Sequence, residues 1–228
     1  MPVNLTRRVV AEALGTAFLL AAVVGSGIMG ERLAGGNDAL ALLANTAATV
    51  AALAALILTF GPLSGAHFNP AVTIVMALRR DLAWSDVLFY LAAQLLGAVA
   101  GVFIAHLMFD EPLVMVSTKA RDGMPQAFSE FIATFGLIAT IWSCSRSRSE
   151  AVPYAVAAYI GAAYWFTAST SFANPAVTIA RALTDTFTGI APLDVPAFIL
   201  AEFAGALAAA CVFRWLMASA PSKGEAAG

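Results

Sequence analysis

Most of the charged residues of this 228-residue chain lie in short segments, and the apolar stretches between them are long enough to cross a lipid bilayer. A helix needs about 20 predominantly apolar residues to span a hydrocarbon core of about 30 Å. Residues of the class AVILMFWYC make up 61% of the chain and charged residues only 11%, too little polar surface for a water-soluble globule. The sequence therefore predicts an integral membrane protein. The apolar stretches are residues 9–29, 39–78, 87–108, 128–144, 151–180 and 195–217.

The overall charge and the cysteine content exclude several classes of protein. The formal net charge is −2 and the chain has no basic run, so we expect no nucleic-acid partner. Both cysteines, Cys144 and Cys211, lie in apolar stretches. Two such residues cannot form a disulfide framework and match no metal-ligand spacing. We therefore expect neither a metal site nor a cofactor.

Two of the apolar stretches have lengths that do not fit whole crossings. Residues 39–78 are too many for one helix and too few for two with a turn, and Gly-Pro-Leu-Ser-Gly at 61–65 interrupts them. The remaining segment of about ten residues reaches about 15 Å, half of the bilayer core. Residues 151–180 repeat this pattern, with a short segment that starts at Asn174. We predict an all-α membrane protein with six transmembrane helices and two re-entrant half-helices, as a single domain over residues 1–228.

The two short segments belong to an internal duplication. Three landmarks recur in the same order, at residues 12–16 and 130–134, 69–74 and 174–179, and 94–98 and 202–206. They indicate a repeat of approximately residues 9–108 and 128–217. Each half contains three crossings, an odd number, so the second half enters the membrane from the opposite side. The repeat is therefore inverted, and the half-helices dip in from opposite faces.

Lysine and arginine residues predict the orientation, because they are enriched on the cytoplasmic side of a membrane protein. With the N-terminus inside, eight of the twelve fall in cytoplasmic segments and four fall outside. We expect a multi-pass protein of a bacterial inner (plasma) membrane with both termini cytoplasmic and residues 218–228 as a short tail. The cytoplasmic set is Arg7, Arg8, Arg79, Arg80, Arg146, Arg148, Arg214 and Lys223.

Two Asn-Pro-Ala boxes on half-length helices, a glutamate in the first and fourth spans, and Ser-Gly-Ala-His at 64–67 together resemble the aquaporin, or major intrinsic protein, family. The resemblance covers nearly the whole chain, from Ala11 to about Ala210. It implies a passive, bidirectional channel for small neutral solutes in the lipid bilayer. It also implies a homotetramer.

Each Asn-Pro-Ala box has a physical role in such a pore. Asparagine is a favoured helix cap and proline loses no hydrogen bond in the first turn, so each box begins a helix. Two helix N-termini at mid-membrane each direct about half an elementary charge at one point and repel cations, a general mechanism of aquaporin-type pores. The asparagine amides can also donate to the oxygen of a passing solute. The predicted pore residues are Asn69, Pro70, Ala71, Asn174, Pro175 and Ala176.

The resemblance also implies a narrower filter toward the outer side. By the family's offsets from the two boxes, its four positions fall on Thr49, Ala162, Ser171 and Val177. Water-selective members have an aromatic residue, a histidine and an arginine there, and this sequence has none of them. We expect a wide aperture, similar to channels for glycerol and for neutral trivalent metalloid hydroxides such as arsenite. Arg181, one turn beyond Val177, either replaces part of the missing charge or, the alternative we favour, is a helix-dipole partner at the outer surface.

Other polar residues within the apolar stretches are expected to support the pore. Glu12 and Glu130 are intramembrane carboxylates, and the resemblance implies that they orient the backbone of the neighbouring re-entrant loops; proton coupling is the alternative. Glu202, whose counterpart in the first half is Gln94, either supports the second loop or contributes to pore function. His67 is expected to line the inner vestibule, with packing and a pH gate as the other interpretations.

Two other classes of function compete with a channel. Ser64 and His67 lie three residues apart in one segment and lack a third orienting group, which argues against an intramembrane serine protease, and we expect no enzyme. A proton-coupled secondary transporter also has inverted repeats and interrupted helices, and would use the intramembrane glutamates. The two are separated by energetics, because a channel conducts downhill and a coupled carrier stops when the proton gradient collapses.

Overall fold

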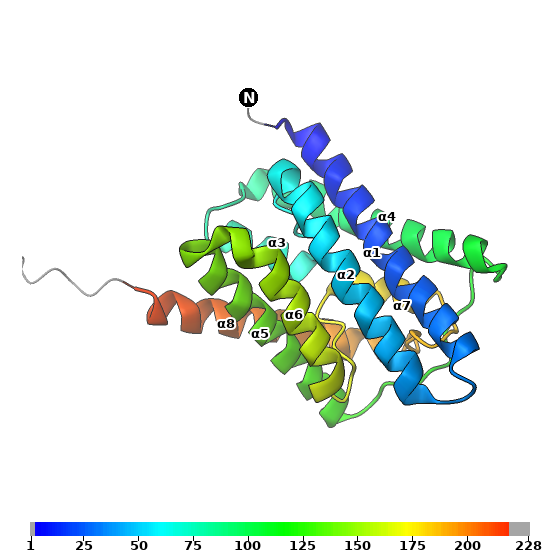
Figure 1. Cartoon of the computed structure of the whole chain (residues 1–228). Helices are drawn as coiled ribbons and strands as arrows, with labels where there is room; N and C mark the ends of the chain where they lie inside the picture. Colours follow the sequence, from blue (N-terminus) through cyan, green and yellow to red (C-terminus); the bar gives the residue numbers. More distant parts are fainter. Residues whose placement is uncertain (1–2, 219–228) are drawn as a thin grey trace, which may run out of the picture.

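The computed structural model describes residues 3–218, and every regular element within them is a helix (Figure 1). Nearly all of the predicted tail at 218–228 lies outside these described residues. The elements are α1 (Leu5–Leu33), α2 (Asp38–Ser64), α3 (Pro70–Leu78), α4 (Trp84–Phe109), α5 (Met124–Ser147), η1 (Ser149–Ala151), α6 (Val152–Phe166), α7 (Pro175–Arg181) and α8 (Val195–Leu216). The predicted all-α class and both half-length helices are confirmed.

Five of these helices, α1, α2, α4, α5 and α8, are long and apolar enough to cross a membrane. The sixth predicted span is shorter than expected, because α6 has only 15 residues, which is about 22 Å at 1.5 Å per residue. It begins at the short 3-10 helix η1 with Pro153 in its first turn, and it ends where Thr167 is extended. Its counterpart in the first half, α2, has 27 residues.

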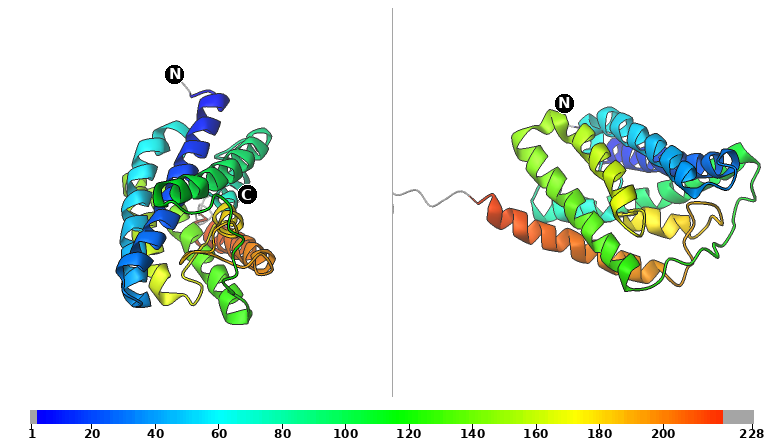
Figure 2. Two further views of the ribbon diagram at one scale, coloured as in Figure 1. Left: turned by 90° about the vertical axis from the view of Figure 1, so that its right-hand side faces the viewer. Right: turned by 60° about the horizontal axis from the view of Figure 1, so that its bottom comes forward.

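The helices form two groups with the same internal packing. In the first, α1 packs against α2 and α4, and in the second, α5 packs against α6 and α8. Figure 2 shows α1 and α2 on one side of the bundle and α8 along α5 on the other, and contacts between α2 and α6 join the groups. The half-helices lie between them, because α3 and α7 each contact both α4 and α8 and also each other. Each half-helix therefore contacts a long helix of its own half and one of the other half, as expected for an inverted repeat.

The end of α2 falls within the predicted break at residues 61–65. The helix continues through Pro62 to Ser64 and ends where Gly65 adopts a φ of 90°, with its N–H bonded to the carbonyl oxygen of Gly61. Glycine is favoured at such a left-handed helix end because it has no Cβ. Gly65, the last residue of the predicted break at 61–65, therefore turns the chain into the first re-entrant loop.

Two glycines at corresponding positions allow close helix contacts in each half. A Cβ atom at Gly97 of α4 would lie 2.3 Å from the carbonyl oxygen of Ala13 in α1. A Cβ atom at Gly205 of α8 would lie 2.3 Å from the carbonyl oxygen of Phe131 in α5. Real contacts are never this short, so only glycine permits these backbones to approach, as is common in membrane helix pairs.

Candidate functional site: a central cavity with two asparagine-capped half-helices

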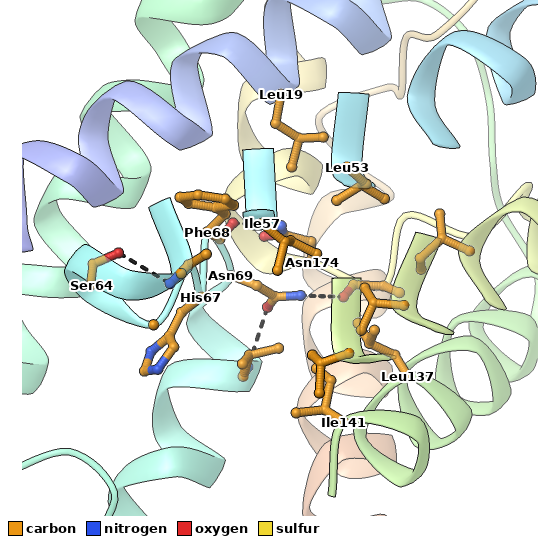
Figure 3. A pocket seen from close by; sticks show the side chains of 18 of the residues that line it. Leu19, Leu53, Ile57, Ser64, His67, Phe68, Asn69, Leu137, Ile141 and Asn174 are labelled. Atoms are coloured by element: carbon orange, nitrogen blue, oxygen red, sulfur yellow. Dashed lines mark hydrogen bonds between the residues drawn. The ribbon is translucent and has the colours of Figure 1, made fainter. Parts of the chain in front are cut away.

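A cavity of about 470 Å³ runs between the two groups of helices. Arg8 and Asp81 belong to its lining at one end, and Arg181 belongs to it at the other. Asn69 and Asn174 lie together on its wall, in the centre of the close view in Figure 3. The wall around them is largely apolar, with Leu19, Leu53, Ile57, Leu137 and Ile141.

The two asparagines cap the half-helices in the same way. The Oδ1 atom of each accepts from the backbone N–H groups two and three residues later, at 2.9 and 3.4 Å for Asn69 and at 3.1 and 3.4 Å for Asn174. Pro70 and Pro175 occupy the first helical positions. Both helices therefore begin at the cavity wall, with their positive dipole ends toward its centre.

The same two side chains also connect the loops of the two halves. Asn69 Nδ2 donates to the carbonyl oxygen of Ala173 at 2.7 Å, and Asn174 Nδ2 donates to the carbonyl oxygen of Phe68 at 2.8 Å. An amide nitrogen carries two N–H bonds, so each asparagine retains a second donor. The arrangement can thus present two N–H donors to the oxygen of a solute in the cavity.

Buried carboxylates hold the backbone of the two re-entrant loops. His67 and Phe68 donate their backbone N–H groups to the two oxygens of Glu12, at 2.9 and 2.7 Å. The corresponding groups of the second loop donate to Glu130 at 2.9 and 2.6 Å. Phe68 and Ala173, which precede the asparagines, have φ values of 51° and 49°, a left-handed conformation that non-glycine residues rarely adopt. The carboxylates satisfy N–H groups that this conformation removes from regular structure.

The third intramembrane carboxyl group breaks the symmetry between the halves. Gln94 Nε2 donates to both Glu12 and Thr73, each at 2.8 Å. At the corresponding position, Glu202 Oε1 accepts from the Thr178 hydroxyl at 2.6 Å and from a backbone N–H of the second box at 3.1 Å. Glu202 Oε2 is buried and has no partner among the described residues. In the first half, by contrast, the Gln94 amide joins the loop-supporting carboxylate to Thr73.

Three of the four predicted filter positions line the cavity, and one does not. Thr49, Ser171 and Val177 belong to its wall. The placement of Ala162 in the filter is wrong, because Ala162 is exposed on α6 and faces away from the cavity. Tyr164, two residues later and 4% exposed, lines the cavity instead and donates from its hydroxyl to Thr49 Oγ1 at 3.3 Å. The family's offset from the second box therefore points to a residue about half a helical turn away from the one that lines the cavity.

Arg181 is not the surface residue that we favoured from the sequence. Its side chain is 3% exposed and lines the cavity, and its Nε donates to the carbonyl oxygen of Thr188. The guanidinium lies 3.4 Å from the ring centre of Phe172. Arg121, from the loop after α4, lies 4.8 Å from the same ring and donates from Nε to the carbonyl oxygen of Gly189 at 2.7 Å. Burial lowers the pKa of Arg121 to about 10, so this guanidinium is charged at neutral pH.

His67 lines the cavity on the other side of the asparagines. Its Nδ1 lies 3.1 Å from the hydroxyl oxygen of Thr73, and its ring centre lies 5.3 Å from that of Tyr90. The side chain is therefore both part of the wall and held by packing, and the two sequence interpretations of this histidine are compatible.

Sequence reasoning missed three residues near Arg181, at one end of the site. Tyr164 was hidden by the length of the loop between α6 and the second box, which shifts the helix register. Phe172 stands two residues before Asn174 and could have been noticed as an aromatic neighbour of the box. Arg121 lies 60 residues before Arg181 in the chain, and only the fold brings both arginines to one aromatic ring.

Comparisons with known proteins agree with this geometry. The family model described as major intrinsic protein matches residues 2–169. The chain is 58% identical over 214 residues to aquaglyceroporin AqpS of Rhizobium meliloti (strain 1021), which covers 94% of this chain and 91% of that protein. It is 32% identical to aquaporin NIP6-1 of Arabidopsis thaliana over 69% of this chain and 52% of the plant protein. The X-ray structure of the aquaglyceroporin from Plasmodium falciparum superposes with a TM-score of 0.69 at 20% identity, covering 92% of this chain and 96% of that one.

Proposed function

This chain belongs to the major intrinsic protein family, and we propose that it is a passive, bidirectional channel for water, glycerol and neutral trivalent metalloid hydroxides such as arsenite. The observation that carries the proposal is the pairing of Asn69 and Asn174 on the wall of one cavity, each with one amide N–H bonded across to the other loop. The remaining N–H donors face the solute path and are proposed to orient hydroxylic solutes in single file.

Cation exclusion is proposed to arise from three sources of positive charge along this path. The N-termini of α3 and α7 each contribute about half an elementary charge. Arg181 adds a full guanidinium charge on the cavity wall, in a low-dielectric environment that strengthens its field. A hydrated cation would have to pass these charges after losing water, whereas a neutral solute meets no such barrier.

The filter is proposed to be wider than that of a water-selective channel. Val177 occupies the position directly after the second box, where the family usually has its filter arginine. The guanidinium of Arg181 lies one helical turn further along α7 and is bonded to Thr188, so the space beside Val177 is bounded by an aliphatic side chain. A small triol or a metalloid trihydroxide has hydroxyl groups for the asparagine donors and tolerates the apolar wall opposite them.

The remaining features of the proposal rest on the sequence and the family. We place the protein in a bacterial inner membrane with cytoplasmic termini, because the loops between crossings carry an asymmetric set of arginines. We propose a homotetramer, as in the family. Glu12, Glu130 and Glu202 are assigned to loop support, since each accepts a backbone N–H group of a re-entrant loop or of its box.

Stopped-flow light scattering on proteoliposomes tests the proposal, with water, glycerol, urea and arsenous acid in turn. Flux above that of empty vesicles, unaffected by a protonophore, is expected for water, glycerol and arsenous acid. Loss of flux when the protonophore is added would instead support the proton-coupled transporter. Asn69→Asp/Asn174→Asp serves as the matched negative control, because it keeps both cap oxygens and removes the N–H donors of both amide groups.

A further inference from the structure

A second cavity, of about 590 Å³, lies where the end of α3 meets α5 and α8, and it adjoins the central cavity, because Asp81 lines both. Its lining includes four arginines and one carboxylate, Arg79, Arg80, Arg146, Arg214 and Asp81. All four arginines belong to the set that the sequence places at the cytoplasmic face. Apart from Asp81, the residues that line it do not belong to the lining of the central cavity.

Two arginines of this basic cavity already have hydrogen-bond partners, Arg79 through the contacts given next and Arg146 through Nη1, which donates to the carbonyl oxygen of Met217 at 3.2 Å. Arg79 donates to the Ser145 hydroxyl at 3.0 Å and to Asp81 at 2.9 Å, and it lies 4.6 Å from the ring centre of Trp142. The side chains of Arg80, Arg146 and Arg214 are exposed, and none is in an ion pair within the described residues.

The grouping of these charges is not explained by the helix end alone. Arg79 and Arg80 follow α3, where cations stabilise the C-terminal dipole. That effect does not require Arg146 of α5 and Arg214 of α8 to open into the same cavity. Four guanidinium groups against one carboxylate repel each other, and a bound anion removes this cost. Guanidinium groups bind phosphate oxygens in pairs of parallel hydrogen bonds.

We propose that the basic cavity binds a phosphate oxyanion, and that its source is the headgroup of an anionic phospholipid of the cytoplasmic leaflet. The residues beside Arg214 favour the lipid, since Trp215 is 76% exposed and Leu216 is 56% exposed on α8. An exposed tryptophan is typical of the bilayer interface. A headgroup in the cavity would leave its acyl chains beside this apolar surface, and basic pockets between membrane helices are suited to such lipids.

The test measures binding of three probes to the purified full chain in neutral detergent: dioctanoyl phosphatidylglycerol, dioctanoyl phosphatidylcholine and inorganic phosphate. Phosphatidylglycerol is expected to bind at least tenfold more tightly than phosphatidylcholine. Arg146→Gln/Arg214→Gln is expected to weaken phosphatidylglycerol binding by about tenfold or more, since each arginine near a lipid surface contributes to attraction. The matched control, Arg7→Gln/Arg148→Gln, removes two exposed arginines of the same face that do not line the cavity, and is expected to change binding less than twofold.

The outcomes distinguish whether the basic cavity binds an oxyanion from whether that oxyanion belongs to a lipid headgroup. Equal binding of both lipids, or equal losses in the two double variants, overturns the basic cavity as a binding site. Inorganic phosphate that binds as tightly as phosphatidylglycerol keeps the oxyanion site and overturns the lipid as its source. Glycerol flux in phosphatidylcholine vesicles is expected to be the same in all three proteins, so failure here does not imply failure of the proposed channel.

Discussion

Asn69 and Asn174 are each bonded to the carbonyl group of the residue that precedes the other, at 2.7 and 2.8 Å. Each side chain therefore has two structural tasks, because its oxygen caps its own helix and one N–H ties the opposite loop. The second N–H is the only part of the amide left for a solute. Capping and the proposed solute binding therefore use different atoms of the same residue.

Replacing one amide by a carboxylate separates these tasks. Asn174→Asp keeps the cap oxygen but loses the donor to Phe68, and it places a negative charge between the two helix N-termini. We expect reduced glycerol flux and a raised proton or sodium leak, because the added charge offsets the positive potential that repels cations. The leak is measured in vesicles loaded with a pH-sensitive dye. A variant as tight to protons as the wild type would show that these helix ends do not exclude cations.

The space beside Val177 predicts how the filter can be narrowed. Val177→Arg is expected to lower glycerol and arsenous acid flux more than water flux, because it adds a long charged side chain to the cavity wall. Stopped-flow measurements give the three rates in one preparation. Val177→Ile is the matched control, since it changes the aliphatic volume slightly and adds no charge. Unchanged glycerol flux in the arginine variant would mean that the filter lies elsewhere.

Arg181 is expected to contribute to the exclusion of cations through its charge, and not to set the width of the filter. Arg181→Met keeps a long side chain against Phe172 but removes the guanidinium and its hydrogen bond to Thr188. We expect a higher cation leak with little change in glycerol flux, since the outer positive charge is lost. Arg181→Lys should retain the low leak. If methionine and lysine variants leak equally, the charge at this position has no role in exclusion.

The sequence predicted the parts of this molecule that depend on local pattern and failed where loop length or distant contacts decide. The half-helices followed from charge-free stretches of unsuitable length, and their caps from Asn-Pro. Ala162 was misplaced because a fixed offset ignores how many residues the loop before Asn174 takes, and Tyr164 took its place in the cavity.

Arg181 shows the other limit. Its position at the end of a short helix resembles that of a surface cation, and no local pattern reports burial. The carbonyl group of Thr188 and the ring of Phe172 surround it only after the second loop has folded back. The family resemblance placed the filter arginine at position 177. In this chain the arginine on the cavity wall is Arg181, one helical turn further along α7.

The asymmetry between Gln94 and Glu202 makes a prediction about stability. A glutamine at position 202 could donate from its amide to Glu130, as Gln94 donates to Glu12. The amide nitrogen would then have a hydrogen-bond partner, whereas Oε2 of Glu202 has none among the described residues. We expect Glu202→Gln to raise stability by about 1 kcal/mol and to keep glycerol flux. The reverse change, Gln94→Glu, should be destabilising, because it removes the donors to Glu12 and Thr73. Loss of transport in Glu202→Gln without loss of folding would favour proton coupling instead.

The close helix contact at Gly205 predicts a strong effect of added volume. Gly205→Val would place a Cβ atom 2.3 Å from the carbonyl oxygen of Phe131, so α5 and α8 must separate, at a cost of about 1–3 kcal/mol or more. We expect a lowered melting temperature in detergent and poor recovery of folded protein. Gly61→Ala is the matched control, because no atom beyond its chain neighbours and the nearby backbone of its own helix lies within 4 Å of the added Cβ, and alanine favours the helix. Equal melting temperatures for both variants would show that α5 and α8 do not pack backbone to backbone. The corresponding contact between Gly97 of α4 and α1 would then be in question as well.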